Sequence, residues 1–122
     1  MPEKKLTMTR VSGAALLVAA LLFLPAPPAS GAEGYVRISS PANGARVDGF
    51  GPTAIAYEAR PGPRGDHVHV YVDGKEVGIL RQLKGSYTLG PLAPGPRALC
   101  VKVVNRAHVP IGIEQCIKVT VD

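Results

Sequence analysis

A strict alternation of apolar and polar residues marks positions 67–72, which read H-V-H-V-Y-V. In an extended chain the three valines fall on one face, and the two histidines and the tyrosine fall on the other. This two-residue period is typical of a β-strand with one buried face. An Asp-Gly pair follows at 73–74, and this dipeptide favours a tight hairpin turn. The pattern therefore predicts a strand whose valines face the core and whose His67 and His69 stand together on the exposed outer face.

Shorter runs of the same kind predict the other strands, separated by turns rich in proline and glycine. No window after residue 32 shows the 3.6-residue apolar period of an amphipathic helix. Turn signals at intervals of roughly 8–12 residues are typical of immunoglobulin-like sandwiches. Because the chain lacks tryptophan, the Cys-Trp-Cys core that lies between the sheets of antibody domains is not expected. We predict an all-β, immunoglobulin-like antiparallel β-sandwich of about seven strands. Its segments are 35–39, continued along one edge by 45–47, then 53–59, 67–72, 75–80, 86–89, 98–104 and 113–121.

The first 32 residues have the features of a secretory signal peptide. Basic residues precede an apolar run at 11–24, and a proline-rich segment then ends in small residues. Ser30 and Ala32 have the spacing that signal peptidase recognises, so cleavage is predicted after Ala32. The alternative is an uncleaved membrane anchor, although the apolar run is shorter than the ~20 residues of a spanning helix. We expect a signal peptide at 1–32 and a periplasmic or secreted domain at 33–122 that leaves the membrane after cleavage.

The mature part, residues 33–122, is long enough for one domain with its own core. Eleven lysines and arginines against eight aspartates and glutamates give it a net charge of +3, compared with +5 for the whole chain. These charges are scattered, and aromatic residues are not interleaved with them. Nucleic-acid binding is therefore not expected.

Both cysteines lie in the mature part, on the two strands of the last predicted hairpin. The alternation in 98–104 and 113–121 places aliphatic residues inward and Cys100 and Cys116 outward. If the cysteines are opposite each other, their Cα atoms are ~4.5 Å apart, which suits a disulfide. The flanking pairs are then 98 with 118, 102 with 114 and 104 with 112. Metal ligation by the thiols is the alternative, but their spacing matches no zinc pattern and an exported pair favours the disulfide. Closing a loop of about 15 residues contributes ~3 kcal/mol.

The fold prediction brings all three histidines to one end of one sheet. In such a sandwich the loop before strand 67–72 and the loop before strand 113–121 lie at the same end. His67 begins its strand, His69 is its same-face neighbour, and His108 lies within the second loop. Imidazoles spaced by ~6.6 Å along a strand can turn onto one ion. A third imidazole from the loop then completes a set of three nitrogens.

Ligation by histidine alone suits Zn(II) or Cu(II). No methionine follows residue 32, so a thioether site for Cu(I) is excluded from the mature part. Asp66 and Tyr71 are the candidates to orient the imidazoles or to supply a fourth ligand.

Three segments of the chain resemble small exported bacterial immunoglobulin-like domains of unknown function. They are D-H-V-H-V-Y-V-D-G at 66–74, L-A-P-G-P-R-A-L at 92–99 and N-R-A-H at 105–108. The domains that they resemble carry an H-x-H-(L/V)-x-(L/V)-D-G strand motif, an L-x-P-G-x-H-x-L segment and a later histidine. The resemblance covers residues 36–121 and implies an immunoglobulin-like sandwich outside the cytoplasm.

The same resemblance matches His67, His69 and His108 to the motif histidines. The chain departs from the pattern at Arg97, where histidine is usual, and at Asp66, where glycine is common. If that further histidine belongs to a site in the similar domains, the site here is incomplete. The resemblance implies no established activity.

Two hypotheses for the function follow. In the first, the domain binds Cu(II) or Zn(II) through surface histidines. In the second, it is a protein-interaction or structural module without metal, whose His and Tyr are ordinary cross-strand packing residues. Exposed aromatic residues such as Tyr35, Phe50 or Tyr57 would then meet the protein partner. Enzymatic activity is not expected, because an outer sheet face offers no dry cavity for a metal-bound water.

Overall fold

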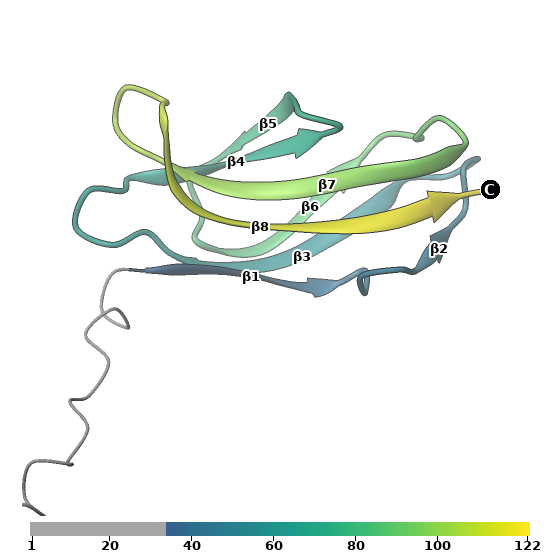
Figure 1. Cartoon of the computed structure of the whole chain (residues 1–122), viewed down its shortest axis with the longest axis horizontal. Coiled ribbons are helices and arrows are strands. Elements are labelled where there is room, and N and C mark those ends of the chain that lie inside the picture. The colour runs from purple at the N-terminus through teal and green to yellow at the C-terminus, as the bar shows by residue number, and fades with distance from the viewer. Residues whose placement is uncertain (1–33) are drawn as a thin grey trace, which may run out of the picture.

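The computed structural model describes residues 34–122, which form two β-sheets packed face to face (Figure 1). This confirms the predicted all-β sandwich. The signal peptide predicted at 1–32 lies outside the described residues. Within 34–122 no helix is long and apolar enough to cross a membrane. The strands are β1 (Tyr35–Ser40), β2 (Arg46–Val47), β3 (Thr53–Arg60), β4 (His67–Val72), β5 (Lys75–Leu80), β6 (Lys84–Leu89), β7 (Gly95–Val104) and β8 (Pro110–Val121).

One sheet has three strands in the order β1-β3-β6, and the other has five in the order β2-β8-β7-β4-β5. The histidine strand β4 thus lies beside β7, and β7 lies beside β8, as predicted. In Figure 1 the β3–β4 and β7–β8 connections reach the same end of the sandwich. This topology places the segment before His67 next to the turn that carries His108.

The core lies between the two sheets and consists of residues at alternate positions along the strands. None of them is more than 7% exposed, because a strand directs successive side chains to opposite faces. Burial of each large aliphatic side chain contributes about 1.5–3 kcal/mol. Of the aromatic residues considered for a partner surface, Tyr57 belongs to this core and is 3% exposed, whereas Phe50 is 93% exposed. The core residues are Ile55, Tyr57, Ala59, Val68, Val70, Leu89, Leu99, Val101, Val103, Ile117, Val119 and Val121.

The last hairpin has the predicted register at its cysteines. Cys100 is opposite Cys116, and the flanking pairs Ala98–Lys118 and Lys102–Glu114 are those predicted. The Cα atoms of the two cysteines are 4.0 Å apart and the disulfide is formed. Beyond Lys102 an irregularity shifts the register, so Val104 pairs with Pro110 and not with Gly112. Strand β8 therefore begins earlier than predicted, and the β7–β8 turn is shorter.

The sandwich is not antiparallel throughout. Strand β2 pairs in parallel with the end of β8, with Arg46 opposite Thr120. We expected 45–47 to continue the edge of the first strand, but the turn at 41–44 carries the chain to the other sheet. Three backbone hydrogen bonds hold it there, from Gly44 N to Lys118 O (2.7 Å), from Thr120 N to Ala45 O (2.9 Å) and from Asp122 N to Val47 O (3.0 Å). The short strand covers an edge of β8 that would otherwise present unpaired backbone groups.

Candidate metal centre

Strand β4 directs two imidazoles to the outer face of the five-stranded sheet. Val68 and Val70 are fully buried in the core on its other face. A slip of one residue would move both valines to the outer face, so their burial fixes the register of the strand. His67 and His69 therefore point outward together, as the alternation predicts.

His67 and His69 are nevertheless buried, with only 1% of each exposed. The prediction of surface histidines is therefore wrong for these two residues, and His108 alone is exposed. The turn between β7 and β8 folds over the sheet, and the ring of His108 lies 4.7 Å from that of His67 and 5.2 Å from that of His69 between centroids. Strand periodicity identifies the two faces of a sheet, but it contains no information about a distant loop that covers one face.

Asn105 gives the covering turn its shape. Its side-chain Oδ1 accepts hydrogen bonds from the backbone N–H groups of Ala107 (2.9 Å) and Val109 (3.1 Å). Its backbone N–H donates to Val109 O, and its carbonyl accepts from His108 N–H, both over 2.9 Å. His108 adopts a φ of 66°, which is uncommon for a residue other than glycine. These bonds hold the imidazole of His108 over β4.

Three imidazole nitrogens, one from each histidine, form a nearly equilateral triangle. Nε2 of His67 is 3.1 Å from Nε2 of His69 and 3.2 Å from Nδ1 of His108. The remaining side, from His69 Nε2 to His108 Nδ1, is 3.1 Å. An ion ~2.05 Å from each nitrogen would lie ~1 Å outside their plane, with N–metal–N angles of ~100°. The three atoms thus have the geometry of one face of a tetrahedral or octahedral site.

The second nitrogen of each strand histidine faces a carboxylate. His67 Nδ1 lies 2.9 Å from Asp66 Oδ2, and His69 Nδ1 lies 3.1 Å from Glu76 Oε1. Because an ionised carboxylate only accepts hydrogen bonds, Nδ1 of His67 carries the proton and its Nε2 directs a lone pair into the triangle. The negative charge of Glu76 beside His69 Nδ1 favours the same tautomer in that ring. The Glu76 contact is close, but it is not aligned as a good hydrogen bond, so His69 Nδ1 is buried without a well-formed partner.

Glu76 was missed in the sequence, although a signal for it exists there. The Asp-Gly turn at 73–74 pairs Tyr71 with Glu76. This register places the glutamate on the outer face, diagonal to His69, where a long side chain reaches its neighbour. The hairpin turn alone therefore indicates a second carboxylate beside the histidines.

The electrostatics favour the protonation states that bind a cation. Burial lowers the pKa of His69, and the neighbouring His67 and His108 lower it further, against the opposing effect of Glu76. For Asp66, the hydrogen bond with His67 is the main cause of a lowered pKa, supported by the nearby guanidinium groups. A neutral imidazole supported by an ionised carboxylate is the form that ligates metals.

Tyr71, the other candidate on this face, packs beside the ligands. Its ring centroid lies 6.3 Å from that of His69, and Lys102 Nζ lies 4.6 Å from it over the ring. Burial raises the pKa of Tyr71, and the carboxylates of Glu76 and Glu114 raise it further. The phenol therefore stays protonated at neutral pH, which argues against Tyr71 as a phenolate ligand of the metal.

Arg97 lies far from the histidines. It is near the beginning of β7, whereas His67 is opposite Val104 at the end of that strand. Seven residues along a strand correspond to roughly 23 Å. A histidine at position 97 would therefore not contribute to this trio, and the trio is not incomplete for lack of it. The guanidinium of Arg97 instead donates hydrogen bonds to Ala93 O, Pro94 O and Asp73 Oδ2.

Comparison with known proteins shows the fold. No family model matches the chain, and no curated protein matches its sequence. Among solved structures it is similar to the fibronectin(III)-like modules of CbhA from Clostridium thermocellum, with a TM-score of 0.57 and 19% identity over 71% of this chain and 95% of that one. An engineered protein has a TM-score of 0.52 and 23% identity over 76% of this chain and 21% of its own. A lytic polysaccharide monooxygenase of Jonesia denitrificans has a TM-score of 0.48 and 16% identity over 69% and 61% of the two chains.

At these identities the likeness concerns the fold alone. The chain is a β-sandwich of the fibronectin III and immunoglobulin type. At one end of its larger sheet it carries a buried cluster of His67 and His69 with His108, a group whose nitrogens are placed to hold a metal ion.

Proposed function

We propose that this protein is an exported immunoglobulin-like domain that binds one Zn(II) or Cu(II) ion through Nε2 of His67, Nε2 of His69 and Nδ1 of His108. The observation that carries the proposal is the triangle of nitrogens with sides of 3.1–3.2 Å. In ordinary packing, an N–H of one ring meets a lone pair of the next. Here the carboxylates of Asp66 and Glu76 favour a proton on Nδ1 of His67 and of His69, so the lone pairs of the two Nε2 atoms face each other. A cation between these nitrogens removes the repulsion.

We expect the centre to hold its ion and not to catalyse a reaction. Catalytic zinc sites keep an open position in a shaped, water-excluding cavity. The cavity beside this centre is lined by Asp66 and loop residues and not by the three ligating rings. With 1% of His67 and of His69 exposed, there is little access to the ion from the sheet side.

Export to the periplasm or beyond the cell is part of the proposal. The disulfide between Cys100 and Cys116 suits an oxidising compartment, and the pattern at 1–32 is that of a cleaved leader. Fractionation of the producing cells, with N-terminal sequencing of the mature protein, tests this. A first residue of Glu33 is expected, and an intact leader in the membrane fraction would contradict the proposal.

The direct test of metal binding is calorimetric titration of the metal-free mature domain with Zn(II) and, separately, with Cu(II). We expect uptake of about one equivalent of ion, as in sites with three imidazole ligands. His67→Ala and His108→Ala should each abolish tight uptake. Lys102→Ala is the matched control, because Lys102 is opposite His69 on the same face and carries no proposed ligand atom. Uptake that survives removal of all three histidines would overturn the assignment.

A second role, as an interaction module, is supported by the apolar residues of β5. This strand is at the edge of the five-stranded sheet, and Val77 is 41% and Ile79 is 50% exposed. An edge strand with apolar side chains favours pairing with another strand. We infer that two copies of the domain pair through β5. Sedimentation velocity over a range of concentrations tests this: Ile79→Lys should weaken the dimer, and a wild-type monomer throughout would exclude it.

A further inference from the structure

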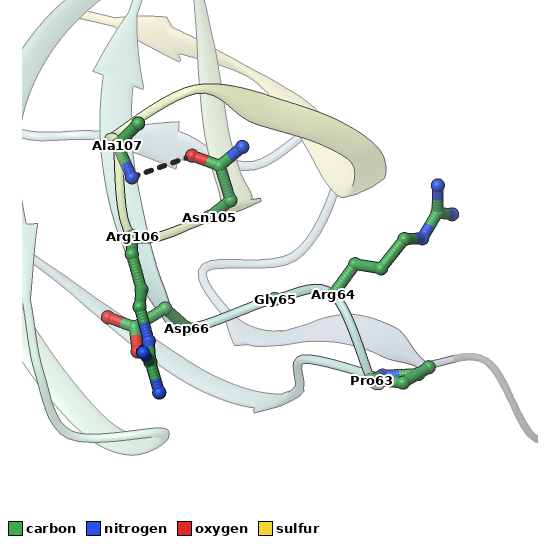
Figure 2. A pocket seen from close by; sticks show the side chains of 7 residues that line it. All are labelled: Pro63, Arg64, Gly65, Asp66, Asn105, Arg106 and Ala107. Carbon is green, nitrogen blue, oxygen red and sulfur yellow. Dashed lines mark hydrogen bonds and ion pairs between the residues drawn. The ribbon is translucent and has the colours of Figure 1, made fainter.

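A cavity with a volume of about 500 Å³ lies next to the proposed metal centre (Figure 2). It separates the end of the β3–β4 connection from the turn that carries His108. We propose that this cavity binds a small molecule with an anionic oxygen group, a carboxylate or a phosphate, and that the anion and the metal are coupled through Asp66; only the coupling rests on the proposed function. The residues that line the cavity are Pro63, Arg64, Gly65, Asp66, Asn105, Arg106 and Ala107.

The side-chain amide of Asn105 offers two hydrogen-bond donors to this cavity. Its Oδ1 is occupied by the backbone N–H groups of Ala107 and Val109, which fixes the orientation of the amide. The NH₂ group therefore lies on the side of the amide away from Ala107, as Figure 2 shows. A neutral residue that shapes the turn thus also presents N–H groups to an acceptor.

Positive charge exceeds negative charge around the cavity. Arg64 and Arg106 line its two walls, and Asp66 is the carboxylate among its lining residues. The carboxylate of Asp66 forms ion pairs with two arginines: Arg81 lies 3.2 Å from its Oδ2 and Arg106 lies 3.9 Å from its Oδ1. Two guanidinium groups therefore lie beside this one carboxylate. Guanidinium groups bind two-oxygen anions through paired, charge-assisted hydrogen bonds.

The walls of the cavity are formed before any ligand arrives. A Cβ atom at Gly65 would lie 2.3 Å from Pro61 O and 2.5 Å from Val103 Cγ1, so this wall packs tightly against the rest of the domain. The backbone N–H of Asp66 donates to Val104 O over 2.8 Å. The side chain of Arg106, which is 94% exposed, is free to adjust. A volume of ~300–1,000 Å³ is usual for small-molecule sites.

Asp66 connects this cavity to the metal centre. Its Oδ2 accepts the hydrogen bond from His67 Nδ1, while Arg106 faces its other oxygen. An anion that draws Arg106 away leaves more of the carboxylate charge to support His67, and it also adds negative charge near the cation. Both effects favour the bound metal, and by linkage the metal raises the affinity for the anion equally.

Inorganic sulfate is a suitable probe, because it binds arginine pairs and is a weak ligand of Zn(II). Metal-free protein is titrated with sulfate at constant ionic strength, and backbone amide shifts are followed by NMR. We expect saturable 1:1 shifts confined to 63–66 and 105–107. Asn105→Asp keeps the oxygen that closes the turn but replaces the two donors with negative charge, so sulfate affinity should fall about tenfold or more. Arg106→Gln should act in the same direction.

Arg37→Gln, which alters an exposed arginine of β1, is the control and should leave sulfate binding unchanged. Shifts that do not saturate, or equal affinity in Asn105→Asp, Arg106→Gln and the wild type, would overturn the anion site. Because this titration contains no metal, it succeeds or fails independently of metal uptake. With Zn(II) bound, sulfate affinity should rise several-fold in the wild type and clearly less in Asp66→Asn, where only the direct attraction between anion and cation remains. Equal affinity in zinc-free and zinc-loaded wild type would overturn the coupling.

Discussion

Nδ1 of His67 donates a hydrogen bond to Oδ2 of Asp66 over 2.9 Å, on the side of the ring opposite the nitrogen that faces His69 and His108. The two residues are adjacent in sequence, at the point where the chain enters β4. Because the backbone N–H of Asp66 also donates to Val104 O, the carboxylate is held by the sheet and not by a free loop. This contact fixes the ring orientation and the tautomer of His67.

Asp66→Asn should therefore weaken metal binding while leaving the fold intact. The amide keeps the shape of the side chain but removes the charge that strengthens His67 as a ligand. We expect a loss of affinity of about 10–100-fold, measured by competition with a chromophoric chelator. Asp122→Asn, at the end of β8 that is remote from the trio, is the control. Equal affinities for Asp66→Asn and the wild type would show that the carboxylate does not support the site.

Zinc should stabilise the wild-type domain and not His108→Ala. A ligand that binds only the folded state adds RT ln(1 + [L]/Kd), which is ~2.7 kcal/mol when the free ion is at 100 times Kd. His108 is exposed and lies in a turn, so its replacement should change the stability of the metal-free protein little. Urea unfolding with and without Zn(II) measures both quantities. An equal gain from zinc in the variant would mean that the ion binds elsewhere.

The stability of the metal-free protein should fall in two steps as the pH is lowered. Burial lowers the pKa of His69 from its ordinary value of 6.5, so the unfolded chain takes up this proton at a higher pH than the folded chain does. Unfolding therefore becomes easier as the pH falls below 6.5, until the pH passes the folded-state value. The second step begins near 3.8, because hydrogen bonds from His67 and from the Ala98 N–H lower the pKa of Asp66 and of Asp73, respectively.

Urea midpoints at a series of pH values measure both steps. His69→Gln should remove the contribution of His69 to the first step, and Asp73→Asn should reduce the second. If the wild type kept the same midpoint between pH values of about 7 and 5, His69 would not be a buried neutral imidazole in solution.

Loss of the disulfide should lower stability without affecting the metal site. Cys100 and Cys116 are 16 residues apart, and opening such a loop costs about 3 kcal/mol by the chain-entropy estimate. The double variant Cys100→Ser with Cys116→Ser should unfold at lower urea concentration than the oxidised wild type. Its zinc affinity should be unchanged, because Cys100 is opposite Tyr71 and not opposite either strand histidine. Midpoints that coincide would show that the bond does not contribute to stability.

Local alternation was sufficient to predict the parts of the fold that depend on strand faces. The inward valines of β4, the outward histidines and the pairing of Cys100 with Cys116 all follow from the period of two. The chain order of the strands, together with the sandwich class, also placed His108 at the correct end. These features are determined by which side chains must leave water.

Features that depend on contacts between distant segments could not be read in this way. The parallel pairing of β2 with β8 arises from a short turn that changes sheets, and no periodicity marks such a change. The burial of His67 and His69 depends on the turn that Asn105 closes, and the same four residues N-R-A-H could equally form an open loop. Glu76 was within reach of sequence reasoning, because the hairpin register identifies it as a neighbour of His69.

The unequal anchoring of the three donors has a consequence for exchange of the ion. Two of the three ligating nitrogens, those of His67 and His69, belong to strand β4, which is hydrogen-bonded to β5 on one side and to β7 on the other. The third, that of His108, belongs to a five-residue turn held by the side chain of Asn105. An ion would then enter and leave mainly through the opening of that one turn. The lifetime of the bound ion would be a property of the Asn105 hinge, and substitutions there should alter the off-rate even though no donor atom has changed.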